Sequence, residues 1–277
     1  MNFGMKQQWE RNLFSWEVTT IPDTPYIFML RKPAALVVDW GDGSRESFDN
    51  PTTTRIFPEH TYASAGVYEI RFESGTCDWF ALGYPGTTPA LVTRITGAVH
   101  PSLGVIYCIS SFSLLVNCTY WHPGFFDAAS ILGSTNQGAF QGTTGFNENL
   151  SRWDTRNATG LREMFYQCPA FNQDISGWDT GKATTMYGMF YQCSHFNQDL
   201  GGWDVGELLS AGAILHSTAL STTNYDKLLI GWAAQVVKPN VPLGVGTTKY
   251  SVAAQAAHDT LTGAPNLWII TDGGLLT

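Results

Sequence analysis

Apolar and polar positions recur every 25 residues through the middle of the chain, from about residue 113 to about residue 216. Two columns of this repeat hold phenylalanine, a third holds tryptophan and a fourth holds asparagine. The columns are Phe140, Phe165 and Phe190; Phe146, Phe171 and Phe196; Trp153, Trp178 and Trp203; and Asn147, Asn172 and Asn197. Each unit has Gly, Pro, Asn or Asp every few residues and too few apolar residues to close a core alone. The pattern therefore predicts a solenoid of roughly four stacked coils with degenerate ends.

Stacked coils place equivalent side chains over one another. Because strand spacing is about 4.8 Å, the aromatic columns should form continuous ladders. An interior asparagine without a partner costs several kcal/mol, so we expect each asparagine to bond the backbone of a neighbouring coil. We interpret all four columns as structural ladder residues.

Two strings within the repeat carry a family resemblance. MFYQCPAFNQDISGWDT from Met164 and MFYQCSHFNQDLGGWDV from Met189 resemble the leucine-rich repeats of BspA-type bacterial and phage surface proteins. The resemblance extends over about residues 90 to 275. It implies a leucine-rich-repeat-like solenoid over residues 86–216.

The end of the chain has a different pattern. YDKLLIGWAAQ from Tyr225 and WIITDGG from Trp268 are similar to the cap that often ends such arrays. This similarity implies a small α/β cap over residues 217–277. The residue pattern itself predicts helices over 225–235 and 250–261, with a short strand over 241–243 between them.

The segment before the repeats is rich in strand signals. Residues 35–40 and 68–72 read as strands, with a tight turn at Gly41-Asp42-Gly43. VDWGDGS from Val38 and HTYASAGVYEI from His60 resemble the polycystic-kidney-disease (PKD) type of immunoglobulin-like β-sandwich. We assign residues 16–85 to such a sandwich, which is short enough that a strand is either missing or supplied by a neighbouring chain. The whole chain is expected to be mainly β with some α.

Two side chains of this segment have expected roles in the sandwich. Trp40 should fill the core, and Tyr62 should anchor a corner of the fold through its hydroxyl.

Charge and hydropathy narrow the function classes. The chain has 15 Lys and Arg against 23 Asp and Glu, a formal net charge of −8, which argues against nucleic-acid binding. No stretch of 18 apolar residues predicts a membrane span. Residues 1–18 lack the apolar centre of a secretory signal. We expect residues 1–15 to dock onto a larger particle, because Trp9, Leu13 and Phe14 have no obvious local core.

Acidic side chains raise two chemical hypotheses. Asp39 and Asp42 are candidates for a calcium site, since hard cations prefer several carboxylate and carbonyl oxygens; the alternative is an ordinary Asx-type turn. Asp154, Asp179 and Asp204 would stand about 4.8 Å apart, close to the separation in retaining glycosidases. A carboxylate repeated in every coil does not provide the two unequal groups that catalysis needs. We therefore expect each of these aspartates to cap its own turn.

The remaining reactive side chains point to no catalytic site. The chain has five cysteines, of which Cys118, Cys168 and Cys193 share a column; coil spacing is too wide for a disulfide, so packed thiols are favoured over a bridge. The histidines lack partners at motif spacing, and no hydrolase, zinc-protease or nucleotide-binding motif occurs. We expect no enzymatic activity, no cofactor and no bound metal.

The architecture and the resemblances together favour display. We expect a non-enzymatic structural protein exposed on a bacteriophage virion, as a tail-fibre, baseplate-associated or capsid decoration protein that mediates adhesion or receptor binding. Its expected partners are other virion proteins, further copies of itself, and a host-surface protein or glycan. The alternative is a bacterial cell-surface adhesin. Candidate contact residues are Trp79, Phe80, Tyr84 and Trp121, for which core or cap packing is the alternative.

Overall fold

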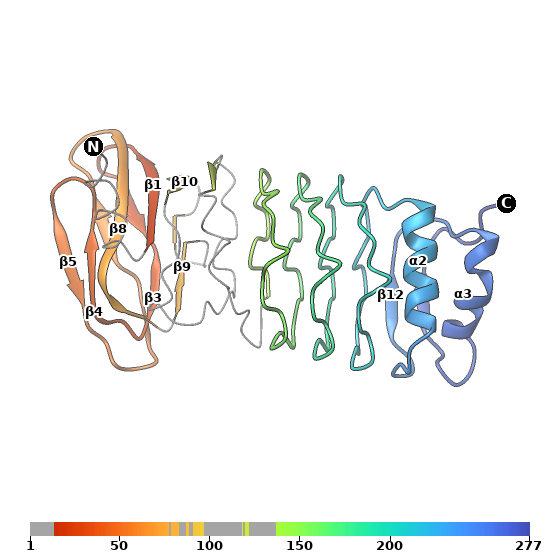
Figure 1. Ribbon diagram of the computed structural model, residues 1–277. Helices are drawn as coiled ribbons and strands as arrows, with labels where there is room; N and C mark the ends of the chain where they lie inside the picture. The colour runs from red at the N-terminus through yellow and green to blue at the C-terminus, as the bar shows by residue number, and fades with distance from the viewer. Residues whose placement is uncertain are drawn as a thin grey trace, which may run out of the picture. The chain divides into compact units, whose positions relative to one another are not determined.

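The computed structural model describes residues 14–77, 79–82, 87–88, 91–96, 118, 120–121 and 137–277, and of residues 79, 120 and 121 only the backbone. The chain divides into two compact units. The described residues up to 121 belong to the first, the N-terminal unit, and residues 137–277 belong to the second, the C-terminal unit. The protein is mainly β with two α-helices in the described part, which confirms the predicted class (Figure 1).

The N-terminal unit consists of short antiparallel strands. They are β1 (Phe14–Thr20), β2 (Pro25–Ile27), β3 (Met29–Arg31), β4 (Ala34–Asp39), β5 (Arg45–Phe48), β6 (Arg55–Ile56), β7 (Glu59–Thr61), β8 (Gly66–Thr76), β9 (Trp79–Ala81), β10 (Val92–Ile95) and β11 (Tyr120–Trp121). One six-stranded sheet has the order β11-β10-β1-β8-β4-β5, in which only the β10–β11 pair is parallel. Two smaller sheets have the orders β2-β7 and β6-β3-β9.

The core of this unit is aromatic. Trp16 of β1 lies edge-to-face with Phe72 of β8 at 5.1 Å between ring centroids, and with Phe28, which follows β2, at 5.4 Å. The Trp16 indole N–H donates to the Tyr26 hydroxyl at 2.8 Å, so its one polar atom is satisfied inside the core. These contacts pack the large sheet against the smaller ones.

The corner predicted around Trp40 is present. Trp40 is buried, and the Tyr62 hydroxyl donates to its carbonyl at 2.9 Å. Gly41 follows with a φ of 83°, and a Cβ at that position would lie 2.5 Å from the Glu69 carbonyl oxygen. Only glycine fits both the backbone angle and this close approach.

The N-terminal unit extends further along the chain than expected. Residue 85 is not its boundary, because β10 pairs with β1 and places Ile95 opposite Trp16. Strand β9 joins the three-stranded sheet, and β10 and β11 extend the six-stranded sheet beyond β1. Phe14 opens β1 and is fully buried, so the prediction that it docks onto a particle is wrong. Trp9 and Leu13 lie outside the described residues.

The C-terminal unit begins with coils that lie side by side, drawn from green to cyan in Figure 1. We call residues 137–220 the repeat stack. Its backbone bonds join neighbouring coils: the amides of Phe140, Phe165 and Phe190 donate to the carbonyls of Met164, Met189 and Ile214 at 2.8, 3.0 and 2.9 Å. Parallel bridges also join Thr185 to Gly160 and to Ser210.

Equivalent aromatic rings stack along this direction. The ring centroids are 5.6 and 5.7 Å apart in the Phe140, Phe165 and Phe190 column, and 5.8 and 6.0 Å apart in the Phe146, Phe171 and Phe196 column. Trp153 and Trp178 are 6.4 Å apart and tilted by 2°. These separations exceed the strand spacing of about 4.8 Å, as expected for parallel rings that are laterally offset.

Side-chain hydrogen bonds follow the same period. The Asn147 Oδ1 accepts from the Asn172 amide, and the Asn172 Oδ1 accepts from the Asn197 amide, each at 2.9 Å. The indole N–H groups of Trp178 and Trp203 donate to the carbonyls of Leu150 and Ile175, at 3.0 and 3.1 Å respectively. The asparagines lie nearer the surface than expected, since Asn147 is exposed and Asn172 and Asn197 are half-buried, whereas the tryptophan bonds are buried. In both columns the partners lie one coil away.

A cap of mixed structure follows the stack. It contains α2 (Thr222–Ala233), β12 (Pro242–Gly244), the 3₁₀ helix η4 (Val252–Ala254), α3 (Gln255–Thr262) and β13 (Ile269–Thr271). These elements correspond to the helix, strand and helix expected from the sequence. Leu243 of β12 forms a parallel bridge with Ala211, so the first strand of the cap continues the stack.

Helix α2 completes the ladders of the last coil. Its N-cap Ser221 donates its amide to the Asn197 Oδ1 at 2.9 Å, and the Asn224 side chain donates to the Asn197 carbonyl at 2.9 Å. Trp232 donates to the Leu200 carbonyl at 2.9 Å, as the ladder tryptophans do one coil earlier. The helix thus supplies the polar partners that a further coil would supply.

We predict that Asn172→Ala lowers the free energy of unfolding by about 1–3 kcal/mol, because it leaves the Asn197 amide without its acceptor. Asn172→Asp keeps an oxygen at that position, so it should lower the free energy of unfolding by less than half as much as Asn172→Ala. Urea unfolding followed by tryptophan fluorescence measures both. Equal losses for the two variants would contradict the role of this acceptor.

Candidate binding site

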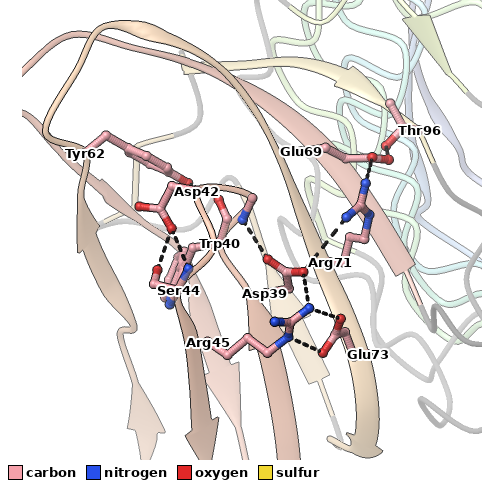
Figure 2. A network of polar contacts seen from close by, with 11 residues as sticks. Asp39, Trp40, Asp42, Ser44, Arg45, Tyr62, Glu69, Arg71, Glu73 and Thr96 are labelled. Carbon is pink, nitrogen blue, oxygen red and sulfur yellow. Dashed lines mark hydrogen bonds and ion pairs between the residues drawn. The ribbon is translucent and has the colours of Figure 1, made fainter.

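Asp39 and Asp42, the candidate calcium ligands, lie at the turn between β4 and β5, which Figure 2 shows. The Asp39 Oδ1 accepts from the Gly41 amide at 2.9 Å, and its Oδ2 lies 3.1 Å from Arg45 Nη2. Arg71 Nη1 is 3.9 Å from the same oxygen. Arg45 also contacts both carboxylate oxygens of Glu73, at 2.9 and 3.1 Å. Asp39 is therefore neutralised by arginines of the sheet.

Asp42 is engaged in the turn itself. Its Oδ1 accepts from the Ser44 amide at 3.0 Å and from the Ser44 hydroxyl at 2.6 Å, and its Oδ2 is 2.7 Å from His60 Nε2. Burial would raise the pKa of Asp42, but the bonds from Ser44 and then His60 outweigh it and lower the pKa to about 2. The Asx-turn interpretation holds here, and both carboxylates already have partners within the protein.

The aspartate column of the repeats also caps turns. Each Oδ1 accepts from the amide two residues further on, in the pairs Asp154 and Arg156, Asp179 and Gly181, and Asp204 and Gly206, at 3.2, 3.2 and 2.9 Å. Among the residues that the structure describes, no three His, Cys, Asp or Glu side chains are grouped to hold a metal ion.

The column cysteines are packed thiols. Cys168 and Cys193 are free and buried, and their thiols donate to the carbonyls of Phe140 and Phe165 at 2.8 and 2.9 Å. Burial raises the pKa of the Cys193 thiol to about 12 and also raises that of Cys168. Neutral buried thiols are poor nucleophiles, so both side chains serve packing.

The contact residues expected from the sequence do not form a site. Phe80 is buried, with its ring centroid 5.0 Å from that of Phe14 and 5.5 Å from that of Phe72, so it belongs to the core of the N-terminal unit. The side chains of Trp79 and Trp121, and the whole of Tyr84, lie outside the described residues.

A groove of about 350 Å³ opens on the surface of the repeat stack. One wall is the column of Gln141, Tyr166 and Tyr191. The other contains Arg162 and Tyr187, four residues before the tyrosines of the first wall. Glu163, Gly188 and Ala213 occupy one repeat position and line the groove as well. We call the six side chains of Gln141, Arg162, Glu163, Tyr166, Tyr187 and Tyr191 the groove face.

Ring stacking holds one wall of the groove, and a cation–π contact holds the other. Tyr166 and Tyr191 have centroids 4.8 Å apart and planes tilted by 7°, and Tyr191 continues onto His216 at 5.2 Å. On the opposite wall, the Arg162 guanidinium carbon lies 4.5 Å from the centroid of the Tyr187 ring. Arg162 Nη2 is also 2.7 Å from the Glu163 Oε1. Contacts within the chain therefore hold the side chains of both walls.

Gly188 keeps the groove open. Its φ is 60°, and Glu163 and Ala213 have φ of 54° at the same repeat position, so the left-handed turn is common to the column. A Cβ at Gly188 would lie 3.4 Å from the Glu163 Cγ and 3.6 Å from the Tyr166 Cδ2. A side chain there would therefore lie against Glu163 and Tyr166, two of the residues that line the groove.

The groove face mixes donors and acceptors. Burial, followed by the nearby Tyr191, Glu163 and Tyr187, raises the pKa of Tyr166, so its hydroxyl stays neutral and can both donate and accept. Tyr187 is 38% exposed, and Arg162 keeps 43% of its side-chain surface in solvent beside a mostly covered Glu163. The face can therefore contact a ligand through ring edges, hydroxyls, a cation and a carboxylate.

Sequence reasoning did not identify this groove. A signal existed in the FYQC strings, where a tyrosine directly follows a buried ladder phenylalanine in two successive units. Tyr166 and Tyr191 recur at the spacing of the ladder phenylalanines, so they stack in a column of their own.

Residues 131–228 match a family described as Mycoplasma protein of unknown function, DUF285. The match covers about a third of the chain and includes the groove face. No curated protein and no solved structure matches the chain. Within the described residues, no helix is both long and apolar enough to cross a membrane.

The low pKa of Asp42 predicts a pH dependence of stability. Folding favours the charged form of Asp42, so this group stabilises the folded protein. The stabilisation is complete above the unfolded-state pKa of about 4 and is lost as the pH falls toward 2. Wild-type protein should lose about 1–2 kcal/mol of stability over that window through this group. Asp42→Asn should be less stable at pH 7 and lack this component. Urea unfolding across the pH range measures both proteins, and identical pH profiles would contradict the assignment.

Proposed function

We propose that this chain is a non-enzymatic adhesion protein that binds a receptor on an external surface through the groove face. The observation that carries the proposal is the preformed groove with its stacked tyrosines. The repeat aspartates and cysteines support a non-catalytic role, since the aspartates cap turns and the cysteines pack in the core. A rigid stack suits display, because its surface side chains are held by their neighbours in successive coils.

The proposal includes a finer assignment of the fold. We infer a leucine-rich-repeat-like solenoid of the BspA type for the C-terminal unit, supported by the 25-residue spacing of its hydrogen bonds. We infer a PKD-like sandwich for the N-terminal unit, supported by the tie between Tyr62 and the Trp40 carbonyl. In this proposal the sandwich attaches the protein to a larger structure, and the solenoid binds the receptor.

The location stays a prediction from the sequence. A phage virion, in which the chain assembles with other virion proteins or with further copies of itself, is our first candidate. The family match favours keeping the bacterial cell-surface adhesin as a second, because that family is described from Mycoplasma. Mass spectrometry separates the two, since a virion protein copurifies with particles and an adhesin is found with cell envelopes.

We expect the fluorescently labelled full chain to bind a subset of cells in a panel of intact bacterial and animal cells. Tyr187→Ala should reduce this binding about tenfold or more, as truncation of a central aromatic contact does. Phe57→Ala is the matched control, because Phe57 is an exposed aromatic residue of the N-terminal unit. Flow cytometry measures the three proteins. Binding to no cell, or equal binding by both variants, would reject the proposed function.

A further inference from the structure

We propose that the groove between Tyr187 and the Tyr166–Tyr191 column is a saccharide site. The inference rests on the proposed function and names the chemical class of its ligand. The groove volume of about 350 Å³ lies at the lower end of the range for small-molecule sites. It therefore suits one or two sugar residues of a longer chain that runs along the open surface.

The polar groups of the groove complement hydroxyl groups. A sugar hydroxyl donates one hydrogen bond and accepts others. Arg162 can only donate, the Glu163 carboxylate can only accept, and the tyrosine hydroxyls can do both. None of the hydroxyls of Tyr166, Tyr187 and Tyr191 bonds to another group in the described part of the chain. The site therefore holds free capacity of both kinds within one small volume.

The aromatic geometry favours an oxygen-rich ligand. The faces of Tyr191 are covered by Tyr166 and His216, so this column presents ring edges to the groove. Ring edges carry partial positive charge and attract oxygen atoms rather than cations. Arg162 covers the Tyr187 ring at 4.5 Å and adds a full positive charge. A quaternary ammonium or lysine-like ligand would meet covered ring faces and a like charge.

The backbone argues against an extended peptide as the ligand. Strand addition needs unpaired amides and carbonyls along an edge. Beside the groove, the Glu163 amide donates to the Tyr187 carbonyl at 2.9 Å, and the Gly188 amide donates to the Gly212 carbonyl at 2.9 Å. These backbone groups are already bonded between neighbouring coils, so a ligand in the groove must be recognised by side chains.

The first test is binding of the full chain to an immobilised panel of neutral and sialylated oligosaccharides built from hexoses and N-acetylhexosamines. We expect binding to some of them. Tyr187→Phe and Tyr191→Phe should each weaken it about fivefold, the effect of one lost hydrogen bond. These variants keep the rings, so the stack is preserved. Gly188→Leu should abolish binding by filling the groove, and Phe57→Ala should bind like wild type.

The second test uses the cells that the labelled chain binds. Periodate cleaves vicinal diols of sugars, so treated cells should lose at least nine-tenths of the binding, whereas protease-treated cells should keep most of it. Binding that resists periodate and disappears with protease would overturn the saccharide site and leave the adhesion proposal standing. Saccharide binding without cell binding would reject adhesion alone. Binding to neither cells nor saccharides would overturn both proposals.

Discussion

The structure depends on one constraint: a coil of the repeat stack satisfies only part of its own polar backbone and cannot cover its own rings. The amide of Phe165 finds its acceptor at Met189, and the amide of Asn172 finds its acceptor at Asn147. An unpaired buried amide costs about 1–3 kcal/mol, so every coil relies on its neighbours. The spacing of 25 residues is the register in which all these needs are met together.

The same constraint explains how the stack ends. A terminal coil would expose the asparagine and tryptophan ladders to solvent unless another element completed them. Helix α2 does so with Ser221, Asn224 and Trp232, although it has a different backbone conformation. The cap therefore reproduces the chemistry of a coil rather than its shape. The surface positions of each 25-residue repeat can vary without disturbing the ladders, and the groove face is built from such positions.

Much of the C-terminal unit could be predicted because its contacts join equivalent residues, which leaves a period in the sequence. The position of β10 in the sheet could not be predicted. This strand pairs with β1, almost eighty residues earlier, and no repeated pattern in the sequence marks that pairing. The groove escaped prediction for a related reason. Arg162 and Tyr187 occupy the same repeat position but differ in type, so their column is invisible until the coils are stacked.

Removal of one complete 25-residue repeat tests the central claim most directly. Deletion of residues 164–188 joins Glu163 to Met189 and preserves the register of every ladder, whereas deletion of residues 164–185 removes three residues fewer and shifts it. Circular dichroism and urea unfolding should show a folded, cooperatively unfolding protein for the first deletion and a severely destabilised one for the second. Equal stability of the two deletions, or loss of folding in the first, would contradict the account.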